Sequence, residues 1–127
     1  MKVLYTAEAL ATGDGRDGHG RTSDGKVDVD LSIQKELGGT GTGTNPEQLF
    51  AVGYAACYHS ALRLVGRQEK ADVSDSAVGA KVSLGSNDAG GFVLAVELGR
   101  CLRFSCGSQG FTRQQRCGRL RPGGRAG

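Results

Sequence analysis

Residues 38–57 read GGTGTGTNPEQLFAVGYAAC and predict a helix that begins directly after a glycine-rich loop. Asn45 is a favoured helix N-cap, and Pro46 takes the first helical position, where its missing N–H costs no hydrogen bond. Gln48 completes the spacing of a capping box, and Glu47 in the first turn complements the helix dipole. We therefore expect a firmly capped helix from Asn45.

The predicted helix continues to about Gly66 and is apolar around much of its girth. Its apolar residues recur at helical spacing: Phe50, Tyr54, Cys57, Ala61 and Val65. A helix with so wide an apolar surface is expected to be buried in the middle of its domain.

Short strands are predicted on both sides of this helix. Alternating apolar residues favour strands over 2–12, 26–33, 78–84 and 92–98, whereas GDGRDGHG at 13–20 is typical of a turn or loop. The order is β-β-α-β-β, which predicts an α+β fold with antiparallel strands.

Length and composition favour one cytoplasmic domain. The chain has 127 residues, and 18 consecutive apolar residues occur nowhere in it, so no membrane span is predicted. The first residues lack the apolar core of a signal peptide. Four cysteines at uneven spacing do not suggest a disulfide framework.

Charge divides the chain into two parts. Residues 1–98 hold 9 basic and 13 acidic residues, whereas residues 99–127 hold 7 arginines and no acid. We therefore predict a domain over 1–98 and an atypical Arg/Gly/Cys-rich tail over 99–127. A basic tail suggests nucleic acid, but few aromatic residues accompany its arginines, so nucleic-acid binding is not predicted.

Cys57 is the main candidate for chemistry, and two interpretations stay open. A free cysteine is commonly a small buried apolar residue. It becomes a nucleophile when a nearby cation lowers its pKa, and Arg16 is a candidate that Glu47 could hold by a bidentate pair. His59 lies two positions from Cys57 and points to another side of the helix, so these two do not predict a Cys–His dyad.

Metal and nucleotide sites are not predicted. Three of the four cysteines lie in the tail without CxxC spacing: Cys101, Cys106 and Cys117. The loop at 39–43 precedes a helix N-terminus, yet it lacks both the Gly-Lys-Ser/Thr of a P-loop and the GxGxxG of a dinucleotide site.

Three segments together resemble one family. LYTAEALATGDGRDG at 4–18, KELGGTGTGTNPEQLFAVGYAAC at 35–57 and GGFVLAVEL at 90–98 are similar to the organic hydroperoxide resistance proteins of the OsmC/Ohr superfamily. The resemblance covers about residues 3–98. It implies antiparallel sheets around a long central helix, in an intertwined homodimer.

The resemblance also implies an activity in oxidative-stress defence. Cys57 matches the cysteine that reduces organic and fatty-acid hydroperoxides. Arg16 matches the arginine that activates this cysteine, and Glu47 matches the residue that orients the arginine. Lipoyl groups on proteins, or another dithiol, would return the electrons, and no metal, haem or flavin takes part. Phe50 and Tyr54 would give the thiol an apolar surround suited to alkyl hydroperoxides.

Helix geometry adds a condition to this implied site. Positions 47 and 57 lie about 15 Å apart along a straight helix, so an arginine held by Glu47 does not reach Cys57 of the same helix. Either the helix is broken, for example near Gly53, or two chains contribute to the site. We predict two chains, with the glycine–threonine loop giving each the freedom to cross to its partner.

The tail departs from the family pattern. The second family helix, with its resolving cysteine, has no counterpart in the sequence after residue 98, and the change in composition is typical of a shifted reading frame. We assign the resolving role to no cysteine. The alternative function is therefore a truncated, non-catalytic remnant that dimerises or binds apolar ligands.

Overall fold

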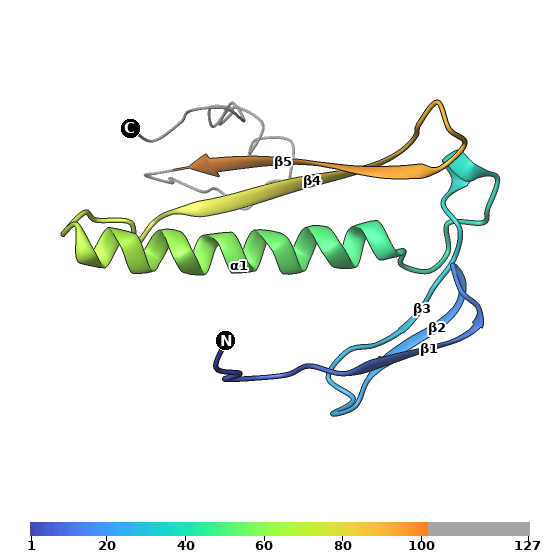
Figure 1. Cartoon of the computed structure of the whole chain (residues 1–127), viewed down its shortest axis with the longest axis horizontal. Helices are drawn as coiled ribbons and strands as arrows, with labels where there is room; N and C mark the ends of the chain where they lie inside the picture. The colour runs from blue at the N-terminus through green and yellow to red at the C-terminus, as the bar shows by residue number, and fades with distance from the viewer. Residues whose placement is uncertain (102–127) are drawn as a thin grey trace. The chain divides into compact units, whose positions relative to one another are not determined.

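The computed structural model describes residues 1–101 and forms two compact units (Figure 1). The first unit is Met1–Leu49, and the second begins at Phe50, inside the only long helix of the described residues. The tail was predicted over 99–127, and its residues 102–127, with Cys106 and Cys117, lie outside the described residues, as does the side chain of Cys101.

The first unit contains a three-stranded antiparallel sheet in the order β1-β2-β3. Its strands are β1 (Ala9–Asp14), β2 (Asp17–Thr22) and β3 (Asp28–Asp30). The predicted strand over 2–12 thus begins only at Ala9, and the strand predicted over 26–33 is shorter than expected.

The turn predicted within 13–20 is confirmed, but it is shorter than that segment, because residues 13–14 and 17–20 belong to the two strands of a tight hairpin. Asp14 pairs directly with Asp17, which leaves Gly15 and Arg16 as a two-residue turn. Gly15 has a φ of +64°, a conformation that glycine adopts at little cost. A Cβ on Gly18 would overlap the backbone carbonyl of Thr12, so glycine also permits the close approach of the two strands.

The glycine–threonine loop at 38–44 is not a loose segment, because it is hydrogen-bonded to the chain before it. It follows a short 3-10 helix, η1 (Lys35–Leu37). Ser32 N–H donates to the Thr44 carbonyl at 2.9 Å, and Thr44 N–H donates to the Asp30 carbonyl at 3.0 Å. A Cβ on Gly43 would lie 2.6 Å from the Asp30 carbonyl oxygen, so glycine lets the loop pack against that strand.

The helix α1 (Pro46–Gln68) is continuous, so the alternative of a break near Gly53 is excluded. The predicted cap at Asn45 is confirmed, since its side-chain oxygen accepts from the Gln48 N–H at 2.9 Å. The reciprocal half of the capping box differs, because the Gln48 side chain accepts from the Thr44 hydroxyl instead.

The second unit adds an antiparallel hairpin of β4 (Ala77–Ser86) and β5 (Phe92–Cys101), which confirms both predicted strands. Hydrogen bonds tie α1 to the segment before β4: His59 Nε2 lies 2.9 Å from the Ser76 hydroxyl, and Arg63 donates to the Ser74 carbonyl at 3.3 Å. The α+β class is confirmed, with one strand more than predicted.

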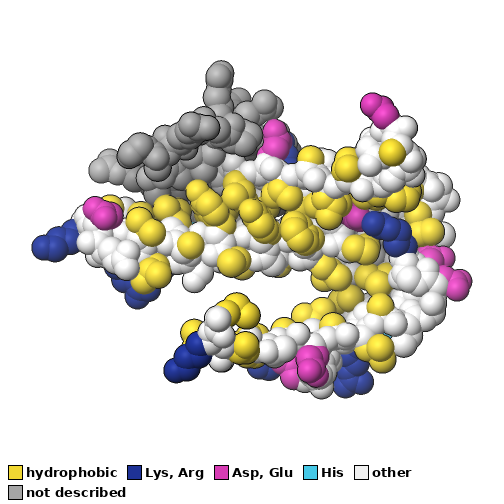
Figure 2. All heavy atoms as spheres, in the orientation of Figure 1, with side chains coloured by type: hydrophobic (Ala, Val, Ile, Leu, Met, Phe, Trp, Pro, Cys, Tyr) yellow, Lys and Arg dark blue, Asp and Glu magenta, His cyan; other side chains and the backbone are white. Residues whose placement is uncertain are grey.

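The exposure of α1 is the largest difference from the sequence prediction, which expected this helix to be buried. Ala80 is the only apolar side chain of the described residues that is buried, whereas Val52 is 72% and Leu64 51% exposed. Hydrophobic side chains gather along α1 and the β4–β5 hairpin (Figure 2). Within the described residues, a single two-stranded hairpin offers too little apolar surface to cover a helix that is apolar on several sides.

Among the described residues, no helix is both long enough and apolar enough to cross a membrane.

Candidate active site

Arg16 projects from the turn of the first hairpin. The one-to-one pairing of β1 and β2 fixes this turn at both of its ends. The side chain of Arg16 is 37% exposed. The long cationic side chain of Arg16 therefore extends from a short, well-defined turn and not from a loose loop.

Arg16 and Glu47 form a bidentate ion pair within the first unit. Arg16 Nη1 donates to Glu47 Oε2 at 2.9 Å, and Nη2 donates to Oε1 at 2.6 Å. The predicted pairing of these two residues is therefore present. Parallel N–H···O bonds of this kind fix the relative orientation of the guanidinium and the carboxylate.

The pair is buried unequally. The side chain of Glu47 is only 10% exposed, against 37% for Arg16. The pair uses two of the five N–H groups of the guanidinium, so the accessible partner keeps donors for another anion.

Electrostatics keeps both groups charged. The hydrogen bonds from Arg16 hold the pKa of Glu47 below its usual range, against the opposing effect of burial. The hydrogen bonds to Glu47 in turn raise the pKa of Arg16. Position in the first turn of α1 further favours an ionised Glu47.

Gln34 is a third member of this cluster, and our reading of the sequence missed it. Its Nε2 donates to Glu47 Oε2 at 2.9 Å, so that oxygen accepts from both Arg16 and Gln34. Gln34 belongs to no recognisable motif. The only available signal was a polar residue directly after the alternating segment that ends at Ile33.

Cys57 lies on α1, ten residues after Glu47 and thus about 15 Å further along the helix axis. It is a free cysteine and is exposed in the single chain. On the same side of α1, the rings of Phe50 and Tyr54 stack with centroids 5.7 Å apart. These rings are 45% and 42% exposed, so they form an open apolar surface beside the thiol instead of a closed pocket.

Comparisons with known proteins identify the family. The family model described as OsmC-like protein matches residues 39–114. The chain belongs to the OsmC-like family. The match extends past residue 98, the boundary that the change in composition predicts.

Named relatives of this OsmC-like chain are organic hydroperoxide resistance proteins. The one from Xanthomonas axonopodis pv. citri is 50% identical over 99 residues, which cover 76% of this chain and 68% of that protein. A crystal structure of one from Legionella pneumophila superposes with a TM-score of 0.73 at 48% identity, over 78% of this chain and 72% of that one.

The match to some relatives is partial. An uncharacterized protein of Acinetobacter baylyi, ACIAD3023, is 49% identical over 85 residues, or 66% of this chain. The matched region spans 59% of the length of that relative.

The two histidines of this OsmC-like chain have partners other than Cys57. His59 bonds with Ser76, on the side of α1 that meets the segment before β4. In β2, His19 Nε2 lies 2.7 Å from Oδ1 of Asp28, and His19 Nδ1 lies 2.8 Å from Oδ1 of Asp30; both aspartates belong to β3. These aspartates, Asp30 first, raise the pKa of His19.

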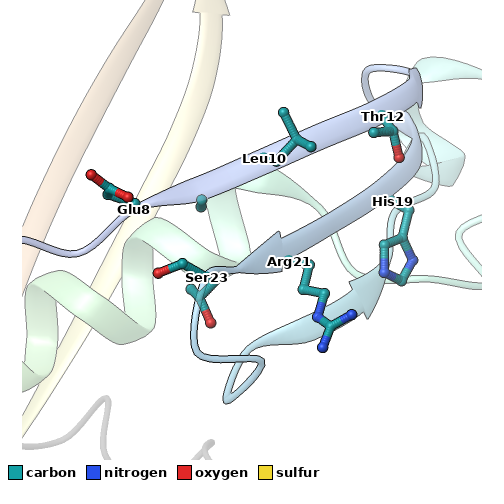
Figure 3. Close-up of a pocket in the computed structure, with 8 residues that line it drawn as sticks. Glu8, Leu10, Thr12, His19, Arg21 and Ser23 are labelled. Atoms are coloured by element: carbon teal, nitrogen blue, oxygen red, sulfur yellow. The ribbon is translucent and has the colours of Figure 1, made fainter.

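An open groove crosses β1 and β2 in the first unit (Figure 3). Its lining is mixed in character: Glu8, Ala9, Leu10, Thr12, His19, Arg21, Thr22 and Ser23. Neither Arg16 nor Glu47 lines it. Among the described residues, no group of three His, Cys, Asp or Glu side chains is arranged to hold a metal ion.

Proposed function

We propose that this chain reduces organic hydroperoxides to alcohols through Cys57, in defence against oxidative stress. The observation that supports this most is the bidentate pair of Arg16 and Glu47, which join a hairpin turn and a helix start 31 residues apart. The relatives reported above are organic hydroperoxide resistance proteins, which agrees with this proposal.

The first chemical step forms a sulfur–oxygen bond. The Cys57 thiolate attacks one oxygen of the hydroperoxide, the O–O bond breaks, and the alkoxide leaves as an alcohol after taking up a proton. Cys57 is oxidised to a sulfenic acid, and the hydroperoxide is reduced. The charged guanidinium of Arg16 would stabilise the thiolate and donate hydrogen bonds to the peroxide oxygens.

A dithiol completes the cycle. One of its thiols attacks the sulfenic sulfur and releases water, which leaves a mixed disulfide. Its second thiol attacks that disulfide, so the dithiol leaves as a cyclic disulfide and Cys57 is again a thiol. We propose a lipoyl group as this reductant, since its two thiols are held for ring closure. The cycle needs no bound cofactor and no resolving cysteine in this chain.

The exposed Phe50–Tyr54 stack favours alkyl hydroperoxides over hydrogen peroxide. Its two rings lie on the helix side that bears Cys57 and present apolar area. Covering the alkyl part of a substrate with such area is favourable by about 25 cal/mol per Å². Hydrogen peroxide has no alkyl part and gains nothing from it.

We also propose that the working site combines two copies of the chain. The continuous helix keeps Glu47 and Cys57 about 15 Å apart, so the Arg16 that Glu47 holds would serve the Cys57 of a second copy. The exposed apolar side of α1 supplies a surface for that copy.

Oxidation of the thiol tests the activity. The full chain is mixed with tert-butyl hydroperoxide, a fatty-acid hydroperoxide or hydrogen peroxide, and loss of thiol is followed by stopped flow, with Cys57→Ser as the control. We expect oxidation by organic hydroperoxides that is orders of magnitude faster than that of free cysteine. A rate equal to that of free cysteine would refute the activity and favour the non-catalytic remnant.

Mixing two inactive variants tests the shared site. Cys57→Ser and Arg16→Met chains are unfolded together, refolded and assayed. Random pairing of chains makes half of the dimers mixed, each with one complete site, so about a quarter of wild-type activity returns. No recovery, in a mixture shown by mass spectrometry to contain mixed dimers, would place Arg16 and Cys57 of each site on one chain.

A further inference from the structure

We infer that Gln34 is a positioning residue of this site, which fixes the plane of the Glu47 carboxylate and so the direction in which Arg16 presents its unused N–H groups. This inference rests on the proposed function for its catalytic consequence, whereas its structural part stands on the cluster alone.

The hydrogen-bond pattern around Glu47 supports this role. Oε1 accepts one hydrogen bond from Arg16, and Oε2 accepts one from Arg16 and one from Gln34, both at 2.9 Å. The terminal torsion of a glutamate has a broad energy profile. Two bonds from one long arginine fix the carboxylate relative to the guanidinium, but they still let the two groups rotate together. A third donor from another element restricts the rotation of the carboxylate.

The backbone of Gln34 is itself held in place. Its carbonyl accepts hydrogen bonds from the N–H groups of Leu37 and Gly39, each at 3.0 Å. Gly41 N–H also donates to the carbonyl of the preceding residue, Ile33. The side-chain NH₂ group of Gln34 that donates to Glu47 therefore extends from a backbone that hydrogen bonds hold in place.

The side chain of Gln34 has no competing local role. Residue 34 occupies the N-cap position of η1, yet its side chain makes no capping hydrogen bond. The amide instead directs its NH₂ group at Glu47, which as a carboxylate only accepts.

The carbonyl oxygen of the Gln34 amide also favours this role. Gln34 Oε1 is buried and has no hydrogen-bond partner among the described residues. An unpaired buried acceptor destabilises a fold, so a residue that served only to fill this space would be better as a hydrocarbon. Among the described residues, the bond to Glu47 is the one side-chain interaction of Gln34 that explains an amide here.

The glycine–threonine loop is what brings Gln34 to Glu47. The chain leaves the sheet at Leu31 and returns at Thr44, and these two residues form a parallel bridge. Helix α1 starts two residues later, so its first turn lies beside the start of the loop. In this role the loop shapes the site.

The test compares Gln34→Met with the wild type and with Gln68→Met, a matched change at the exposed last residue of α1. Methionine keeps the length of the side chain and removes both the donor and the unpaired acceptor. We expect a raised Glu47 pKa by carbon-13 NMR, an unchanged or higher unfolding midpoint, and a roughly tenfold slower oxidation of Cys57 by organic hydroperoxide. Gln68→Met should change none of the three.

Two results separate this inference from the proposed function. A Glu47 pKa that does not move in Gln34→Met, or an active variant with an unchanged oxidation rate, would overturn the positioning role. If Glu47 moves but the wild-type thiol is oxidised no faster than free cysteine, the contact stands and the peroxidase proposal fails.

A measurement on the wild type covers the case in which Gln34→Met does not fold. The Gln34 side-chain NH₂ signals should shift with pH at the midpoint of Glu47, and Glu47→Gln should abolish that shift. NH₂ signals that ignore the titration of Glu47 would overturn the inference without any change at position 34.

Discussion

Removing Arg16 and Glu47 separately and together measures how strongly the pair holds the hairpin turn to the helix start. The cycle compares Arg16→Met, Glu47→Gln and the double variant. A hydrogen bond to a charged group contributes about 1.5–3 kcal/mol, whereas a fully exposed ion pair contributes at most about 1 kcal/mol. Because Arg16 is 37% exposed and Glu47 only 10%, we expect a coupling of about 1–2 kcal/mol.

The unequal burial of Arg16 and Glu47 predicts which of the two single variants lowers the free energy of unfolding more. Arg16→Met leaves a buried carboxylate with Gln34 as its one side-chain donor, which is costly. Glu47→Gln leaves a guanidinium that is partly solvated and can still donate to the new amide oxygen. Arg16→Met should therefore lower the free energy of unfolding more than Glu47→Gln does.

The pH dependence of the coupling follows from Glu47. Its pKa is lowered in the folded chain, so the stabilisation is complete above the unfolded pKa of about 4.3 and is lost as the pH falls through the folded pKa. Arg16 stays charged throughout this range, because its pKa is raised further.

Urea unfolding at one fixed chain concentration supplies the four free energies, since association would otherwise alter them. The cycle is measured at pH 7 and again below the folded pKa of Glu47. Additivity of the two variants within about 0.3 kcal/mol at pH 7 would show that the pair does not stabilise the fold, and a coupling that persists in acid would show that it does not depend on an ionised Glu47. A larger loss for Glu47→Gln than for Arg16→Met would contradict the argument from burial.

Three further predictions concern stability. Asn45→Ala should lower the free energy of unfolding by about 1 kcal/mol through loss of the helix cap, whereas a change to Asp should retain it; urea unfolding of both variants decides this. The raised pKa of His19 means that its contribution is complete below the unfolded pKa of about 6.5 and is lost as the pH rises through the folded pKa. Proton NMR should show a lower His19 pKa in Asp30→Asn, and an unchanged value would refute the assignment. Gly43→Ala should destabilise the chain because its Cβ would meet the Asp30 carbonyl, whereas Gly85→Ala, with 3.7 Å to its nearest neighbour, should cost much less; similar melting temperatures would count against this packing.

Local chemistry explains what the sequence predicted well. The start of α1 depends on Asn45, Pro46 and Glu47 in direct succession, so three adjacent residues sufficed to place it. The β4 and β5 strands alternate cleanly around a glycine-containing turn and were equally readable. The pairing of Arg16 with Glu47 also followed from their chemical complementarity and the family resemblance.

Other features depend on contacts that local patterns do not contain. Gly18 and Gly20 have low strand propensity, and their segment becomes a strand by pairing with β1 and β3. Gln34 gains its role from a carboxylate 13 residues away, which the loop folds back to meet. The exposure of α1 in the single chain was not predicted. An apolar helix face indicates that other residues pack against it, but it does not indicate whether those residues belong to the same chain or to another.

The scarcity of buried apolar side chains bears on how copies of this protein become stable, because Ala80 is the one buried apolar side chain that the structure describes. If a second copy covers α1, most of the hydrophobic free energy of the native state is released by the meeting of two chains, not by the collapse of one. Dilution would then act as a denaturant, and the melting temperature would fall with each tenfold drop in concentration. Newly translated copies would depend on one another from the moment they leave the ribosome.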